Sequence, residues 1–230
     1  MSDTDRYIAL ISSLPNSERL FVAKQPPLSR LRLNRRLSVL RPEDARTLTL
    51  IERLLSWSEY DMSDDIGTVS SRVKVALRDI PQHSLRDLVE ERMEVRTAVA
   101  ALRMRHRSDS APTDPWGYGR WTRHIAANWS DPTFRLNRSM PWLRQAATLI
   151  EQRDPHELER HLLEVTFRQL QRRLAHHQFD FEAVVIYVLK WNIFDRWAQS
   201  NSEAATKRFL DLSVDALGEF PDLILEGELR

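Results

Sequence analysis

The chain has 230 residues, and its 34 basic and 33 acidic side chains leave a formal net charge of +1. Its 5 glycines offer few positions where a positive φ is cheap, which argues against many hairpins and against phosphate-binding loops. The absence of cysteine excludes disulfides, thiol nucleophiles and thiolate metal sites.

Leu, Arg, Glu and Ala dominate the composition, and all four are good helix formers. We therefore expect an all-α fold, a compact multi-helix bundle of about eight helices with a short extended N-terminal segment. A chain of this length can build one large domain or two small ones, so the division has to come from the pattern along the sequence.

The N-terminal half is expected to span residues 1–107. Its first apolar patch, Tyr7–Ile11, is interpreted as a short buried strand or extended segment. Helices are then predicted at 28–40, 42–57 and 69–80. The longest helix is predicted over 85–106, with Ser84 as its N-cap and an apolar stripe along one face. Its charged residues are interpreted as solvated pairs of an amphipathic helix, namely Glu90, Glu91, Arg92, Glu94 and Arg96.

A segment rich in Ser, Pro and Asp, residues 108–115, is the best linker in the chain. The C-terminal half is expected over 116–220, followed by an acidic tail at 221–230. Its helices are predicted at 121–129, 141–150, 155–177, 180–198 and 202–218. Asp154 and Ser202 are expected to cap the third and the last of these.

The C-terminal half is expected to be built around the helix at 180–198. Asp180 is a suitable N-cap, and the residues after it are apolar on almost every face. Such a helix is either a membrane span or the centre of a core. Charged residues interrupt it, so no uncharged stretch approaches the roughly 20 residues that a bilayer requires. The core interpretation is favoured, with Tyr187, Trp191 and Trp197 as core anchors.

Positive charge is concentrated in parts of the chain, and most of it is arginine. Residues 95–145 carry nine arginines against three acids. Arginine suits interfaces because its planar group forms paired contacts with carboxylates and phosphates, although biased codon usage explains the composition equally well. Arg103, Arg105 and Arg107 form a basic helix end, and with Arg196 they are the candidate interface residues. If Arg196 has a structural role in place of an interface role, we expect it to form an ion pair with Asp195 or Glu203.

Familiar catalytic and cofactor motifs are absent from the sequence. There is no GxxxxGK[ST] or GxGxxG motif, and Gly117-x-Gly119 is interpreted as a tight turn before a helix. His156 and His161 are five residues apart, whereas two metal ligands on one helix face need a spacing of four. We therefore expect no enzyme activity, no metal and no cofactor.

Several stretches together resemble a known family. They are Phe181-Glu182-Ala183, Tyr187–Lys190, Arg196-Trp197 and Phe209, with Tyr7–Pro15 and Leu88–Arg105 elsewhere. This arrangement resembles a bacterial group associated with the V-type (archaeal-type) ATPase and its C-type central-stalk subunit. That subunit is usually longer, with three similar helical modules, and this chain has room for about two.

The resemblance implies an all-helical, non-catalytic adaptor that couples the rotating stalk to the membrane rotor ring. Its partners would be stalk and ring subunits, and it would be cytoplasmic, reaching the membrane only through the complex. The alternative is an arginine-rich helical nucleic-acid-binding protein, in which arginines contact phosphates and the aromatics of 116–142 stack on bases. An enzyme whose site is assembled from distant residues ranks third.

Overall fold

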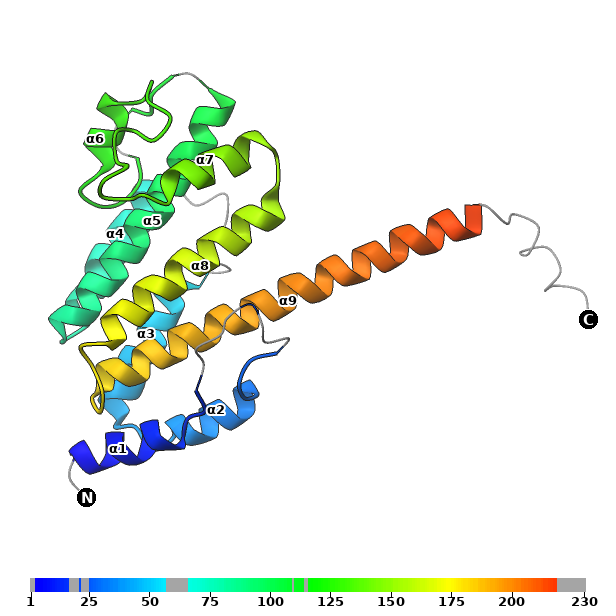
Figure 1. Cartoon of the computed structure of the whole chain (residues 1–230). Coiled ribbons are helices and arrows are strands. Elements are labelled where there is room, and N and C mark those ends of the chain that lie inside the picture. Colours follow the sequence, from blue (N-terminus) through cyan, green and yellow to red (C-terminus); the bar gives the residue numbers. More distant parts are fainter. Residues whose placement is uncertain are drawn as a thin grey trace, which may run out of the picture.

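The computed structural model describes residues 3–16, 21, 25–56, 66–108, 110–113 and 116–218, with backbone alone at 3–4, 66–69 and 202–218. These residues form nine helices and no strand, which confirms the expected all-α fold. The helices are α1 Asp3–Ser13, α2 Arg30–Leu37, α3 Pro42–Leu55, α4 Ile66–Arg78, α5 His83–Arg107, α6 Thr122–Ala127, α7 Leu143–Glu151, α8 Pro155–Leu174 and α9 Phe181–Gly218. Figure 1 shows how they pack.

Two hydrophobic clusters form the core. The first combines α1 to α4 and the start of α5 with the end of α8 and the first half of α9. The second combines the end of α5 with α6, α7 and the start of α8. The long helices α5 and α8 run through both clusters and join them (Figure 1). Both clusters draw residues from either side of 108–115, so the division at that linker stays a prediction.

The first half of α9 lies inside the first cluster. Trp191 and Trp197 are 4% and 8% exposed, and Tyr187 packs partly buried against the same cluster. The indole N–H of Trp191 donates to the Leu28 carbonyl at 2.7 Å. Asp180 caps the helix as expected, because its Oδ1 accepts from the Ala183 amide at 2.8 Å. This part of the helix is fixed at its start and along its length.

Tyr187 is expected to make the folded state less stable at alkaline pH. Its hydroxyl donates to the Pro15 carbonyl at 3.1 Å, and burial raises its pKa to about 12. A tyrosine pKa is about 10 in an unfolded chain, so the folded state favours the neutral phenol. Its contribution is present below about pH 10 and is lost as pH rises toward about 12.

We expect Tyr187→Phe to show a shallower loss of stability than the wild type between about pH 9 and about pH 12. Urea unfolding followed by circular dichroism across this range measures it. Parallel pH profiles for the two proteins would contradict the assignment of this loss to Tyr187.

The N-terminal patch is helical, so the expected strand or extended segment is wrong. Tyr7–Ile11 lies within α1, where Leu10 is 3% exposed and Tyr7 donates to a carboxylate oxygen of Asp44. A short apolar run is compatible with either a strand or a helix. Here the helix places Leu10 in the first cluster, and the described residues contain no strand with which an extended segment could pair.

Three further boundaries differ from the prediction. The helix α9 is continuous through Ser202, because residues 198–217 include no Gly or Pro that would end it. The N-cap of α5 is Gln82, and the Ser84 hydroxyl instead donates to Glu182 of α9 at 3.1 Å. The helix predicted at 121–129 is limited to α6, after which the chain turns through a positive φ at Phe134.

Two glycines let the chain turn tightly against α5, as the sequence predicts for Gly117-x-Gly119. Their φ values are 63° and 94°, in the left-handed region that favours glycine. The turn is tied to α5 by the Tyr118 amide, which donates to Thr97 at 2.7 Å, and by the Arg120 amide, which donates to Glu94 at 3.1 Å. The turn therefore has a structural role.

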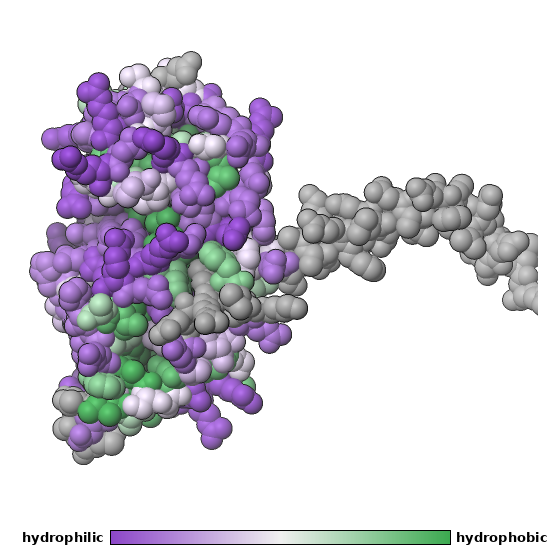
Figure 2. Space-filling model, in the orientation of Figure 1, coloured by the Kyte–Doolittle hydropathy of each residue, from purple (hydrophilic) through white to green (hydrophobic). Residues whose placement is uncertain are grey.

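Hydrophilic side chains cover most of the face in Figure 2, with apolar side chains visible in smaller patches. Among the described residues, no helix combines the length and the apolar character needed to cross a bilayer. Residues 109, 114 and 115 of the predicted linker and the whole acidic tail at 221–230 lie outside the described residues.

Candidate functional site

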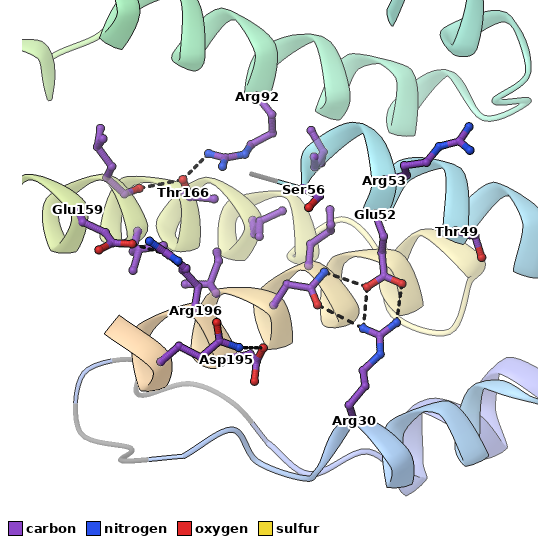
Figure 3. A pocket seen from close by; sticks show the side chains of 18 of the residues that line it. Arg30, Thr49, Glu52, Arg53, Ser56, Arg92, Glu159, Thr166, Asp195 and Arg196 are labelled. Atoms are coloured by element: carbon purple, nitrogen blue, oxygen red, sulfur yellow. Dashed lines mark hydrogen bonds and ion pairs between the residues drawn. The ribbon is translucent and has the colours of Figure 1, made fainter. Parts of the chain in front are cut away.

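A cavity of about 1010 Å³ opens between α3, α5, α8 and α9 (Figure 3). Its wall is mixed, with leucines of α8 and α9 beside arginines and carboxylates from five helices. The volume is at the upper end of the range of small-molecule pockets. This cavity is the candidate site that the structure offers.

Arg92 is the most unusual residue of the cavity. It is 8% exposed, and Figure 3 shows its side chain reaching from α5 toward α8. Its Nη1 donates to the Thr166 hydroxyl, which itself donates to the Leu162 carbonyl at 2.8 Å. Among the described residues Arg92 has no carboxylate partner, so one neutral hydroxyl serves a group with five N–H donors.

The environment of Arg92 penalises its charge. Burial, reinforced by the nearby Arg96, lowers the pKa of Arg92 to about 9, so it still carries its charge at neutral pH. Glu91 opposes this shift, but its carboxylate pairs with Arg173 at 2.7 Å. Arg96 donates to the carbonyls at the C-terminal end of α3, including that of the C-cap residue Ser56 at 3.1 Å. An uncompensated buried charge is costly, so the position of Arg92 calls for a reason.

The other charges of the cavity are mostly paired. Arg30 contacts Glu52 through two hydrogen bonds of 2.8 Å, and this bonding raises the pKa of Arg30. Asn192 donates to the same carboxylate at 2.9 Å. Arg196 pairs with Glu159 at 2.6 Å. Both ion pairs are drawn in Figure 3.

Charge does not balance within the cavity. Five arginines and three carboxylates line it, which leaves an excess of two positive charges. Once the two ion pairs are set aside, Arg53, Arg92 and Arg103 remain against Asp195. Burial raises the pKa of Asp195, so its negative charge is disfavoured. The cavity is suited to an anion.

The predicted interface residues do not form one group. Arg103 is exposed and lines the cavity, whereas Arg105 and Arg107 lie beyond it at the end of α5. Arg196 lies on α9 at the opposite wall. Its partner is Glu159 of α8, so the expected pairing with Asp195 is wrong, and Glu203 has no described side chain. Asp195 instead accepts from Gln199 at 2.8 Å.

Two of the charged residues of α5 are buried, although the local pattern predicts that they are solvated. Arg92 and Glu94 are each 8% exposed, so their interpretation as solvated residues is wrong. They face the cavity and the glycine turn respectively. One feature of the sequence agrees with this burial: Arg92 and Glu94 alternate with the apolar residues Met93 and Val95, which are also buried.

One group of possible metal ligands is present in the described part of the chain. His177, Asp180 and Glu182 bring donor atoms within 4.8 Å of one another. Each already has a local partner: His177 Nδ1 is 2.8 Å from Asp180, Asp180 caps α9, and Glu182 accepts from Ser84. These bonds account for the group as the start of α9.

The second half of α9 is a separate feature. The helix has 38 residues, of which the first part packs on α8, α1 and α3. Ser200 still contacts α8, since its hydroxyl donates to Glu159 at 2.8 Å, and beyond Ser200 the helix extends away from the other helices (Figure 1). At 1.5 Å per residue, the extension to Gly218 is about 27 Å long.

Comparison with protein-family models, with curated proteins and with solved structures finds no match for this chain.

Proposed function

We propose that the chain is a non-catalytic helical adaptor that docks on a partner protein through the second half of α9. The observation that carries this proposal is the form of α9. Its first half is buried between other helices, so it holds the second half in a fixed direction away from the body (Figure 1). An anchored, projecting helix can present a recognition surface.

The sequence of the projecting part favours a helical partner. Ala205, Phe209, Leu212 and Ala216 follow one another at intervals of four, three and four residues. Residues with this spacing share one face of a helix and form the seam of helix pairs. A helix of this length is marginal in water by itself, so packing on a partner would stabilise it.

The charge of the chain end defines the partner further. After Phe209 the chain carries one arginine against six acids. Complementary charge steers association, so the partner surface is expected to be an apolar helical groove with basic flanks. We propose the stalk and rotor-ring subunits of a V-type ATPase as the first partners to test, because the resemblance of 181–209 to that family includes this helix. This assignment would place the chain in the cytoplasm, beside the membrane.

The test compares two double variants in capture from the native cell. Phe209→Glu/Leu212→Glu puts two negative charges on the apolar face of the projecting helix. We expect this double variant to reduce capture of the partner at least about tenfold. Thr206→Glu/Ser213→Glu adds the same two charges to the same helix but outside its apolar face, and we expect this double variant to retain the partner. Both proteins should melt with the wild type, because this part of α9 extends away from the other helices (Figure 1).

Mass spectrometry identifies what is captured. If stalk or ring subunits are lost only from the Phe209→Glu/Leu212→Glu sample, the result supports docking through α9 and also supports the V-type ATPase as the partner. Full capture by that variant would refute docking through α9. Capture of RNA or DNA that nuclease removes, with affinity falling steeply as salt rises, would instead favour the nucleic-acid alternative.

A further inference from the structure

The cavity between α3, α5, α8 and α9 contains a charge that the protein itself does not neutralise. Arg92 is buried at the cavity, and within the described part of the chain Thr166 is its one hydrogen-bond partner. A guanidinium binds an oxyanion through two parallel N–H bonds, and such a pair is stronger in a water-poor site than on the surface. The unused donors of Arg92 therefore fit a ligand that brings the missing negative charge.

The remaining charges of the cavity favour the same class of ligand. Arg53 and Arg103 are exposed and line the cavity without a carboxylate partner among the described residues. They extend the positive potential outward from Arg92, which raises the local concentration of an anion. Glu52 and Glu159 do not cancel this potential, because each is held by its own arginine.

The wall beside Arg92 is apolar. On α8, Leu162, Leu163 and Leu170 line the cavity together with Thr166, and Leu189 and Ile193 of α9 line it as well. Binding pockets for small organic molecules combine such a wall with a few polar groups that fix orientation. Inorganic phosphate alone would leave this apolar wall unused.

We propose that this cavity binds an organic anion whose carboxylate or phosphate group pairs with Arg92 and whose apolar body lies along the leucines of α8 and α9. The two headgroups share the oxyanion geometry that an arginine recognises. This inference does not rest on docking through α9, since the described residues that line the cavity belong to α2, α3, α5, α8 and the first half of α9.

Four probes separate the parts of this proposal in titration calorimetry of the full chain. Octanoate and octyl phosphate carry the two headgroups, octanol carries the apolar body alone, and inorganic phosphate carries the charge alone. We expect one of the two anions to bind with one site per chain, at least about tenfold more tightly than octanol or inorganic phosphate. The ratio between octanoate and octyl phosphate identifies the headgroup.

Two arginine variants assign the binding to the cavity. We expect Arg92→Met to weaken the bound anion at least about tenfold and to leave octanol binding unchanged. Arg168→Met is the matched control. Arg168 stands on α8 with its side chain 70% exposed, pairs with Glu164, and does not line the cavity. It should bind the anion within about twofold of the wild type.

The folding of Arg92→Met provides an independent measure. Because the variant removes an uncompensated buried charge, its melting temperature without ligand should be equal to or above that of the wild type. The anion should raise the melting temperature of the wild type and not that of the variant. Failure of both anions to bind, equal binding of octanol, or equal anion affinity in the wild type and Arg92→Met would each overturn the proposal. The wild-type comparison of probes holds even if the variant does not fold.

Discussion

Replacing Trp197 by alanine is expected to lower the free energy of unfolding by about 3–5 kcal/mol. Trp197 is 8% exposed, and its ring packs edge-on against Phe21 with 5.0 Å between centroids. On another side it lies 5.7 Å from the ring of His156. Truncation removes these contacts and leaves a cavity where α9 meets its neighbours. Urea unfolding followed by far-UV circular dichroism measures the loss.

The matched control is Leu31→Ala, which removes an apolar side chain that is 80% exposed. We expect that variant to change the free energy of unfolding by no more than about 0.5 kcal/mol. Trp197→Phe should lie between the two, because it retains part of the ring volume. An unchanged unfolding curve for Trp197→Ala would mean that this face of α9 is a surface, and the burial of the first half of α9 would then lose its support.

The elements that the sequence predicts well are those determined by nearby residues. Asp154 and Asp180 are N-caps in the structure, each accepting a hydrogen bond from the amide three residues later. The apolar character of 181–197 on almost every face also predicts a central helix. These signals are local, because a cap needs only its own helix start and burial of a whole helix needs only its own composition.

The N-terminal segment and the end of α9 show where local signals are insufficient. Tyr7–Ile11 is too short for its periodicity to separate a helix from a strand, and packing of Leu10 in the first cluster decides the outcome. At Ser202 a good capping residue has no effect, since a cap acts only where the helix before it ends. The continuous helix that results is the feature from which the adaptor proposal follows.

Local patterns in the sequence do not predict the candidate site either, because its interacting residues are far apart along the chain. Arg92 and Thr166 are 74 positions apart, and Arg196 and Glu159 are 37 apart. No spacing rule connects such pairs, and a charged residue within an amphipathic helix resembles a solvated one until its neighbours are known. The sequence shows Arg103 only as part of a basic helix end, whereas in the structure it lines the cavity.

Replacing Gly119 by alanine is expected to lower the free energy of unfolding by about 3–5 kcal/mol. Its φ of 94° is strained for any residue with a side chain, which accounts for about 1–3 kcal/mol. A Cβ there would also lie 2.4 Å from Cγ of Glu94, which is buried. Moving Glu94 breaks its bond with the Arg120 amide and disturbs the 3.4 Å ion pair between the same carboxylate and the Arg120 side chain.

A double-mutant cycle separates the two causes of this loss. Glu94→Ala removes the side chain that the new Cβ would meet, so Gly119→Ala in that background should cost only the backbone strain. We expect the double variant to be more stable than the sum of the single losses implies, by at least about 1 kcal/mol. Urea unfolding of the four proteins measures this coupling. Additive losses would show that the close approach of the turn to α5 is not what requires glycine, and the strain of the backbone alone would then account for the whole effect.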